Sequence, residues 1–353
     1  MKYGQQTVSY CLEVSNVLNK IPWKKVLMVL YIILVILSVL VVAGFLYLKF
    51  GVHAPNVEEP TPPQVTDNIN AGNESPDPDE SSQPPETPTS GRQKETYTCL
   101  IFGEDATSGC TDTIMVATFD VPNQKIGLVS IPRDTKVRTD RSQASCKINA
   151  AYSIGGAEQL EKEASELLGI PIDFYIKIRL TAFQKLVDQV GGVWFEVPRD
   201  MNYDDPAQNL HIHQKAGLRK LSGEDAMEVV RFRQDIYGND SWGDTGRASV
   251  QQAFLKAMLS QVISEAGVDD IPGLVDVLLN YVDTDAKLND MLYFGKALVG
   301  MDIDSAVSTA TLPASWVYPF MIVNKEEALE TINELLNPFE EEITEKMVEF
   351  LSA

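Results

Sequence analysis

Residues 96–135 read TYTCLIFGEDATSGCTDTIMVATFDVPNQKIGLVSIPRDT, and this stretch decides the fold. It contains three short runs rich in apolar and β-branched residues, at 96–102, 113–119 and 125–131, which predict three strands. The segment FDVPNQ is typical of a hairpin connection between the second and third runs. We expect an antiparallel meander, in which the end of the first strand, the start of the second and the end of the third share one edge of a sheet.

Four charged residues occupy that predicted edge. Asp105 follows the first strand, Asp112 begins the second, and Arg133 and Asp134 follow the third. Two carboxylates at such a place could hold Mg²⁺, which favours one or two carboxylates together with phosphate oxygens of a substrate. The alternative use of aspartate is in turns and helix caps. Arg133 could reach a phosphate that Asp134 helps to orient, or the two could form a structural salt bridge.

Helical and strand patterns alternate along the rest of the domain. The sequence predicts helices at 155–168, from a capping box TAFQ at 181–184 to 190, and at 223–230, 248–263, 284–298 and 326–336, and strands at 172–180, 193–197 and 306–312. A last helix is expected after Pro338, with an acidic start suited to the helix dipole. This order predicts an α/β domain with a mixed β-sheet flanked by helices, completed by its C-terminal third.

Two further arginine motifs point to an anion site. If the RFR segment is a strand, Arg231 and Arg233 point to the same face, where like charges need an anion or acids to neutralise them. Downstream, GDTGR leads into a helix on which Arg247 and Gln251, four residues apart, share a face. A solvated face is the alternative for each motif, but the apolar neighbours of Arg231 favour burial.

The net charge and the positions of the arginines limit the kinds of molecule that the protein can bind. The chain of 353 residues has a formal net charge of -21, yet every arginine lies between Arg92 and Arg247. The planar fork of arginine fits phosphate oxygens and stays charged at working pH, so a local phosphate site is expected in an otherwise acidic protein. This balance excludes a general nucleic-acid binder, which needs a net basic surface.

The N-terminal part predicts a membrane anchor. The run that begins at Val26 and ends at Leu48 (residues 26–48) carries no charge and is long enough to cross a bilayer. Lysine residues dominate before the run, so residues 1–25 are expected in the cytoplasm and everything after the run outside the cell. A cleaved signal peptide is the alternative. Residues 49–94 are rich in proline and acidic residues and predict an extended linker, which leaves 95–353 as the folded extracytoplasmic domain.

Motifs along this domain resemble one known family. LIFGED, TDTIMVATFD, VSIPRDT, KINAAYSIGG, GIPIDFYIKI, GLRKLSGEDAMEVVRFRQD and GDTGRASVQQAF run in family order from about Cys99 to Leu255. The chain resembles the LytR-CpsA-Psr family of cell-wall glycopolymer ligases. It departs from the family pattern at Val250, where many relatives have arginine, at Glu104 and at Gln234, which bears on substrate preference more than on the reaction class.

The resemblance implies the chemistry and the residues that perform it. Family members transfer a glycopolymer from an undecaprenyl-pyrophosphate carrier to peptidoglycan, at the C6 hydroxyl of N-acetylmuramic acid, and the lipid tail enters an apolar cavity between sheet and helices. By this resemblance Asp105 and Asp112 hold Mg²⁺. The resemblance also implies that the pyrophosphate oxygens are bound by Arg133, Arg231, Arg233, Arg247 and Gln251. Lys147 and Arg199 are supporting candidates, and Asp134 and Asp235 are nearby carboxylates. The identity of a general base stays open. Such positioning and charge neutralisation suit phosphoryl transfer.

Two other functions stay open at this point, as do the roles of the cysteines and histidines. A membrane-tethered binder of anionic wall polymers would need the arginines but not both aspartates, and a lipid pyrophosphatase would use water as the acceptor. Cys110 and Cys146 lie in loops beside the expected site, and their disulfide is the pairing to test first. His211 and His213 alternate on one strand face, which favours a surface strand over a metal site.

Overall fold

The computed structural model describes residues 51–57, 91–104, 110–206, 210–233, 243–265 and 279–352, and six residues between 31 and 47. The chain divides into two compact units, Met1–His53 and Ala54–Ala353, of which the second holds the folded domain. Most of the predicted span at 26–48, most of the linker, Asp105 and Asp235 lie outside the described residues. Within the described part of the chain, no helix has the length and apolar character that a membrane crossing requires.

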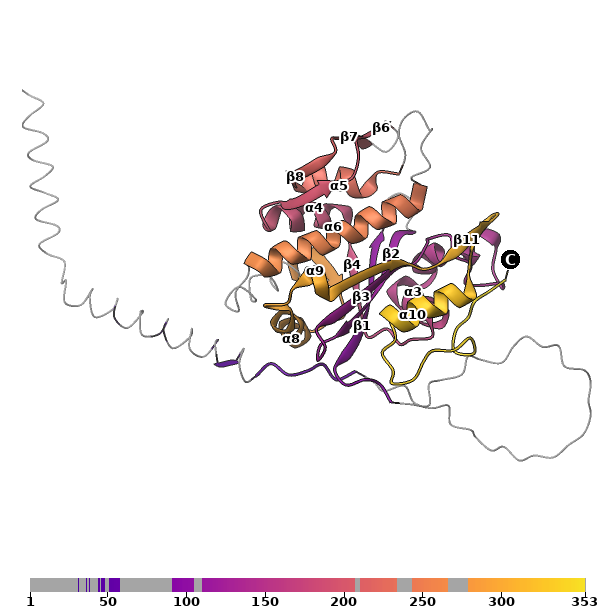
Figure 1. The fold of residues 1–353 in the computed structure, drawn as a ribbon, viewed down its shortest axis with the longest axis horizontal. Coiled ribbons are helices and arrows are strands. Elements are labelled where there is room, and N and C mark those ends of the chain that lie inside the picture. Colours follow the sequence, from indigo (N-terminus) through magenta and orange to yellow (C-terminus); the bar gives the residue numbers. More distant parts are fainter. Residues whose placement is uncertain are drawn as a thin grey trace, which may run out of the picture. The chain divides into compact units, whose positions relative to one another are not determined.

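A six-stranded mixed sheet forms the centre of the domain (Figure 1), with the strand order β10-β3-β2-β1-β4-β9. Its first three strands, β1 (Thr96–Glu104), β2 (Thr111–Asp120) and β3 (Lys125–Ser130), pair antiparallel, so the predicted meander is confirmed. β4 (Phe174–Ile178) runs parallel to β1, and β10 (Val307–Thr311) runs parallel to β3. β9 (Val282–Thr284) closes the far edge antiparallel to β4.

Helices cover both faces of this sheet. The main core lies on one face, where Leu100 and Phe102 of β1 pack with α3 (Ala151–Leu168) and α10 (Lys325–Leu335). Alternate side chains of β1 point to the other face, because strand side chains alternate with period two. There Tyr97 contacts Phe294 of α8 (Leu288–Leu298) with ring centroids 5.2 Å apart. The predicted mixed sheet flanked by helices is confirmed.

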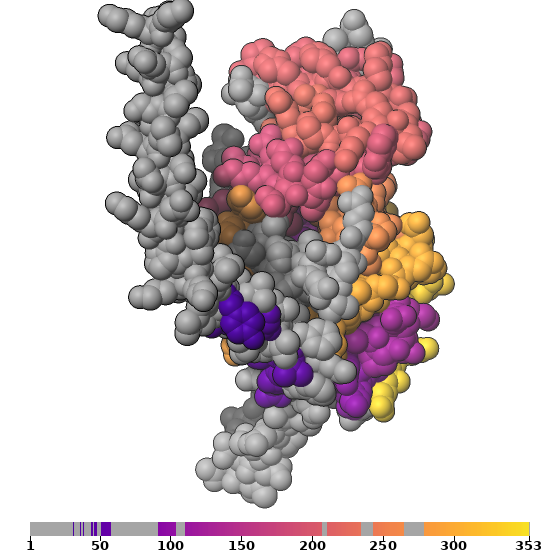
Figure 2. All heavy atoms as spheres, turned by 90° about the vertical axis from the view of Figure 1, so that its left-hand side faces the viewer, coloured from indigo at the N-terminus to yellow at the C-terminus, as the bar shows by residue number. Residues whose placement is uncertain are grey.

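A second group of elements stands over one end of the sheet. It contains α4 (Leu180–Gln189), α5 (Gly223–Arg231) and two two-stranded antiparallel sheets, β5–β8 (Val193–Val197, Gly217–Leu221) and β6–β7 (Met201–Asp205, Leu210–Gln214). The long helix α6 (Gly243–Glu265) joins this group to the sheet, since it contacts β5, α5, β3 and β10. Figure 2 shows the α4–α5 group, in pink and salmon, as one continuous region of the surface. These elements have their own core, centred on Phe232 and Phe254.

The C-terminal third packs on the central sheet. After β10 come the hairpin β11–β12 (Ala314–Val317, Phe320–Val323) and α10. α10 lies directly against β3: a Cβ atom on Gly127 would be 1.7 Å from the carbonyl oxygen of Leu335. Thr118 Oγ1 also donates a 2.8 Å hydrogen bond to the carbonyl of Leu336. This close approach requires glycine at position 127.

Three local predictions are wrong. The TAFQ capping box does not form, because β4 ends at Ile178 and α4 begins at Leu180, so Arg179 is the N-cap. Residues 284–298 divide into the end of β9 and α8. The segment after Pro338 is not helical: Asn333 pairs with the backbone of Ile343 in both directions, at 2.9 and 2.7 Å, while Phe339 enters the main core. Burial of an extended segment replaces helix formation there.

The cysteines and histidines have structural surroundings. Cys110 and Cys146 are thiols and are not joined by a disulfide. Cys146 is buried and donates to the carbonyl of Arg141 at 3.3 Å, whereas Cys110 lines a cavity, so the two face different surroundings. His211 and His213 are both exposed on β7 beside Asp204, and the expected surface strand is confirmed.

Candidate active site

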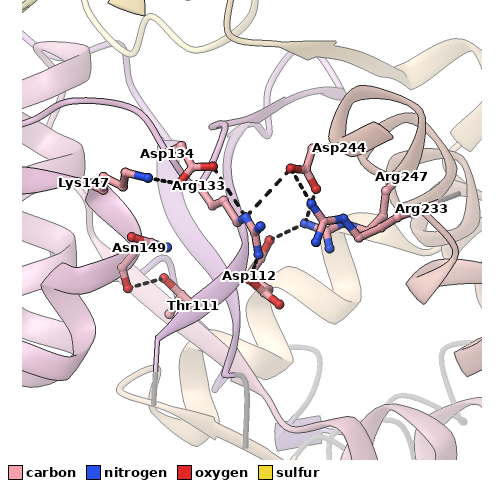
Figure 3. Close-up of polar contacts among 9 residues, drawn as sticks. All are labelled: Thr111, Asp112, Arg133, Asp134, Lys147, Asn149, Arg233, Asp244 and Arg247. Atoms are coloured by element: carbon pink, nitrogen blue, oxygen red, sulfur yellow. Dashed lines mark hydrogen bonds and ion pairs between the residues drawn. The ribbon is translucent and has the colours of Figure 1, made fainter. Parts of the chain in front are cut away.

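The start of β2 and the end of β3 meet at one edge of the sheet, and their charged residues form an ion pair there. Arg133 Nη1 donates a 2.5 Å hydrogen bond to Asp112 Oδ1 (Figure 3). Arg133 Nε lies 3.8 Å from Asp134 Oδ2, and Lys147 Nζ donates to Asp134 Oδ1 at 2.7 Å. The meander therefore brings together Asp112, Arg133 and Asp134 as the sequence predicts.

Acids stabilise the charge of Arg133. Burial acts to lower its pKa, but the hydrogen bond with Asp112 and the charges of Asp112, Asp244 and Asp134 outweigh burial and raise the pKa above its ordinary value. The guanidinium thus keeps its positive charge over the whole working pH range. A fixed cation at the sheet edge suits the binding of phosphate oxygens.

Two more arginines approach from α6 and the segment after α5, and Asp244 joins them. Asp244 Oδ2 accepts from Arg233 Nη2 at 2.9 Å, and Asp244 Oδ1 lies 2.9 Å from Arg247 Nη2. The same aspartate lies 3.8 Å from Arg133 Nε. Arg247 Nη2 also donates to the carbonyl of Asp112 at 3.3 Å. One carboxylate thus holds three guanidinium groups close together, as Figure 3 shows.

Arg247 is the most enclosed of these three cations. Its side chain is only 9% exposed, against 42% for Arg233. Burial lowers the pKa of Arg247, the charge of Asp244 opposes that effect, and the nearby Arg233 adds to it. An arginine stays charged even so. Concentrated positive charge with limited access to water makes this place attractive to a multivalent anion.

Asp244 was missed in the sequence, although a signal was present. It lies three residues before Arg247 in the first turn of α6, where an acid suits the helix dipole and an i, i+3 pair is close in space. Gly243, with a φ of 57°, starts the helix, and its amide donates to the carbonyl of Arg233 at 3.1 Å. This turn brings Asp244 to Arg233, a contact that spacing along the chain does not predict.

The RFR segment is not a strand, contrary to the prediction. Arg231 is the last residue of α5, and Phe232, 1% exposed, caps this helix with extended backbone. The apolar Phe232 enters the core of the α4–α5 group and so ends the helix between the two arginines. Arg231 and Arg233 nevertheless both line the same cavity. The two arginines therefore approach the same place as expected, but the end of helix α5 brings them there rather than a strand.

This cavity has a volume of about 820 Å³ and a lining of two chemically different kinds. Its polar lining residues are Asp112, Arg133, Asp134, Asn149, Arg179, Arg231, Arg233, Arg247 and Gln251. Its apolar walls come from β1, α4, α5 and α6, and include Ile101, Phe183, Leu186, Met227, Val230, Phe254, Leu255 and Met258. The cavity expected between sheet and helices is present. It can accept a molecule with an anionic head and a long apolar chain.

Three predicted binding residues have different surroundings. Gln251 lines the cavity and donates to the carbonyl of Val230 at 3.1 Å, which positions its amide. Lys147 reaches the site through Asp134. Arg199 is outside the lining of the cavity, with its guanidinium 6.0 Å from the centroid of the Phe232 ring.

The polar residues that line the cavity fit a magnesium ion in part. Asp112 presents a carboxylate to the cavity, and its side chain is 40% exposed. Its predicted partner Asp105 lies outside the described residues, and the described part of the chain contains no group of three or more His, Cys, Asp or Glu that could hold a metal by itself. Mg²⁺ commonly takes one or two carboxylates and completes its shell with phosphate oxygens and water, so Asp112 fits such a site.

Comparison with known proteins identifies relatives. The model of the LytR_cpsA_psr family matches residues 64–337. The chain is 29% identical over 234 residues to the polyisoprenyl-teichoic acid–peptidoglycan teichoic acid transferase TagV of Bacillus subtilis, covering 64% of this chain and 59% of TagV. It is 31% identical over 202 residues to the corresponding transferase TagU of Halalkalibacterium halodurans, covering 56% of this chain and 64% of TagU. Both matches thus span less than two thirds of the relative.

Solved structures agree with the fold. The crystal structure of Bacillus subtilis TagV superposes with a TM-score of 0.59 and 26% identity, covering 69% of this chain and 96% of that one. The structure of TagT bound to LIIa-WTA has the same fold, with a TM-score of 0.55 and 21% identity, covering 69% of this chain and 91% of that one. Because the family model covers well over half of its length, this chain belongs to the LytR_cpsA_psr family.

Proposed function

We propose that this protein transfers a glycopolymer from an undecaprenyl-pyrophosphate carrier to peptidoglycan, at the C6 hydroxyl of N-acetylmuramic acid. The observation that carries the proposal is the cavity of about 820 Å³ whose lining combines clustered arginines with apolar side chains. A pyrophosphate with a polyprenyl tail matches both kinds of lining. The names of TagV and TagU as teichoic acid–peptidoglycan transferases support the same reaction.

The chain's own residues provide charge and position in this reaction. Arg133, Arg233 and Arg247 bind the pyrophosphate oxygens and stabilise the negative charge of the transition state, while Arg231 and Gln251 hold the phosphate from the α5 side. Such fixed charges act strongly because they need not reorganise as the reaction proceeds. Asp112 would hold Mg²⁺, which, when bound, neutralises charge on the pyrophosphate. Two further carboxylates lie next to these arginines in the sequence, Asp134 directly after Arg133 and Asp235 two residues after Arg233.

The location proposed for this reaction is the outer face of the cell membrane. Residues 26–48 would anchor the chain and the acidic linker at 49–94 would hold the domain near the membrane. The lipid carrier then reaches the cavity from the same bilayer. A Gram-positive bacterium is the expected source, because its wall polymers are joined to peptidoglycan.

The test is turnover by the full chain in detergent with a synthetic lipid-pyrophosphate-linked glycan, a peptidoglycan acceptor and Mg²⁺. We expect polymer bound through a phosphodiester, and loss of product in Asp112→Ala and Arg231→Ala. Lys215→Ala is the control, because Lys215 is 71% exposed and pairs with Asp200 outside the cavity lining. Tight lipid binding without any turnover would instead identify a binder of wall polymers, and phosphate transfer to water in the presence of acceptor would identify a pyrophosphatase.

A further inference from the structure

The β11–β12 hairpin exposes two aromatic side chains beside the active site. Trp316 is 56% exposed and Tyr318 is 83% exposed, and their ring centroids lie 6.4 Å apart at an angle of 76°. Large aromatic side chains that stay in water on an ordered hairpin contribute nothing to the core. Such pairs mark binding surfaces, because an aromatic ring combines an apolar face with low conformational entropy.

Backbone hydrogen bonds hold this hairpin to the segment that carries the active-site residues. Met321 N donates to the carbonyl of Asp134 at 2.9 Å, and Lys136 N donates to the carbonyl of Met321 at 3.1 Å. Trp316 is paired with Met321 in the hairpin register. The position of Trp316 is therefore tied to the residues that directly follow Arg133.

A second, smaller pocket connects the hairpin with the arginines. It has a volume of about 120 Å³, and its lining includes Trp316 and Met321 of the hairpin together with Asp244, Thr245 and Thr311. It shares six lining residues with the large cavity: Asp112, Thr113, Arg133, Asp134, Arg247 and Gln251. The two pockets thus adjoin at the same charged wall. A volume of this size admits a few waters or a hydroxymethyl arm, but no polyprenyl chain.

We propose that Trp316 and Tyr318 form the acceptor subsite, where a sugar ring of the glycan acceptor packs while its primary hydroxyl enters the smaller pocket. The inference rests on the proposed function. The negative face of an aromatic ring attracts the C–H-rich face of a sugar, and the pocket offers hydroxyl and carboxylate partners for sugar hydroxyls. The donor then occupies the large cavity, and the acceptor approaches from the other side of Arg133 and Asp112.

In the proposed transfer step, one bond to phosphorus forms and one breaks. The acceptor oxygen forms a bond to the phosphorus that carries the glycopolymer, and the bond from that phosphorus to the bridging oxygen breaks. The electron pair leaves with undecaprenyl phosphate. The proton of the acceptor hydroxyl passes to a carboxylate that lines the small pocket and then to water. Entry of acceptor and departure of the leaving group from two adjoining pockets suits an in-line displacement.

A lipid surface is the competing occupant, because tryptophan and tyrosine also favour membrane interfaces. The polar groups beside the hairpin favour a sugar instead. The small pocket next to Trp316 is lined by three carboxylates, Asp112, Asp134 and Asp244, together with Arg133 and Arg247. Sugar hydroxyls can donate hydrogen bonds to these carboxylates and accept them from the arginines, whereas lipid acyl chains can do neither.

The experiment measures binding and kinetics of the full chain in detergent with uncrosslinked peptidoglycan glycan strands as the acceptor. Trp316→Ala and Tyr318→Ala should each raise the acceptor Kd and KM by about tenfold, whereas the donor KM and kcat at saturating acceptor stay within about twofold. Trp194→Ala on β5 is the matched control, because that tryptophan is 55% exposed, and it should change neither constant. Trp316→Phe should restore most of the acceptor affinity.

Each outcome decides the inference. Unchanged acceptor Kd and KM in both hairpin variants would overturn it, as would a loss of binding to anionic phospholipid vesicles with acceptor binding intact. The acceptor Kd is measured without donor, so absence of transfer by the wild-type chain would defeat the proposed function but leave this inference tested by binding. Tyr318 has its ring in solvent, so Tyr318→Ala retains the fold even if Trp316→Ala does not.

Discussion

Asp244 accepts a 2.9 Å hydrogen bond from Arg233, eleven positions earlier in the chain. The same carboxylate contacts Arg247 at 2.9 Å and Arg133 at 3.8 Å. A single acid therefore holds cations that come from the sheet edge, the segment after α5 and the start of α6. In the free protein it offsets their mutual repulsion, and all three arginines line the cavity.

Asp244→Asn should separate anion binding from catalysis. Inorganic pyrophosphate should bind several-fold more tightly, because one negative charge is removed beside three arginines. Turnover should fall by about tenfold to a hundredfold, since the arginines lose their common anchor and small displacements of catalytic groups are costly. Calorimetry and the transfer assay check the two effects. Asp140→Asn, in a 3.6 Å surface pair with Arg138, is the control, and unchanged turnover in Asp244→Asn would contradict the prediction.

Adjacent glutamines on α6 should give opposite phenotypes. Gln252 is buried and donates to Ser130 Oγ at 2.7 Å and to the carbonyl of Ala310 at 2.6 Å, so Gln252→Ala should lower the free energy of unfolding by about 1–3 kcal/mol. Gln251→Ala should mainly lower turnover, because Gln251 lines the cavity. Urea unfolding and transfer rates distinguish the two variants. Equal stability loss in both would show that Gln251 is structural.

Gly127→Ala should destabilise the domain strongly. The added methyl group would meet the carbonyl of Leu335 at 1.7 Å, and that atom belongs to the backbone of α10. Relief requires movement of the helix off the sheet, which costs at least about 2–3 kcal/mol. Gly103→Ala is the control, because its nearest contact would be 3.7 Å. A shared urea midpoint for the two variants would be incompatible with this packing.

The stability of the domain should depend on pH through Glu161 of α3. Burial, with the charges of Asp285 and Glu158, raises the pKa of Glu161 to about 7. An unfolded glutamate titrates near pH 4.3, so between about pH 4.3 and pH 7 the folded state binds more protons than the unfolded state. The free energy of unfolding should therefore fall as the pH rises through this window, by on the order of 1 kcal/mol after solvent screening.

Glu161→Gln should remove this pH dependence, which urea unfolding at several pH values between 4.5 and 7.5 measures. Glu330→Gln, an exposed acid on α10, is the charge-matched control and should keep the slope of the parent chain. Persistence of the full slope in Glu161→Gln would assign it to another group. The carboxylate of Asp285, whose charge contributes to the raised pKa of Glu161, accepts a hydrogen bond from the amide of Tyr175 at 2.9 Å.

The meander and its charged edge could be predicted because strand alternation and a short hairpin are local properties. Once three consecutive strands pair antiparallel, Asp112 and Arg133 must come to the same edge, and they form a 2.5 Å contact there. The nature of the RFR segment could not be predicted in the same way. Its two arginines fit a strand pattern as well as a helix end, and burial of Phe232 decides between them.

The sequence by itself determined the α/β class, the strands that carry Asp112 and Arg133, and an arginine set able to bind phosphate, because these depend on residue type and short-range periodicity. Only the tertiary structure decided that Asp244 would hold Arg133, Arg233 and Arg247 together. It also decided that a cavity of about 820 Å³ would adjoin a small pocket beside Trp316. Those relationships depend on how α5, α6 and the β11–β12 hairpin pack on the sheet, and packing between distant segments leaves no periodic trace in the chain.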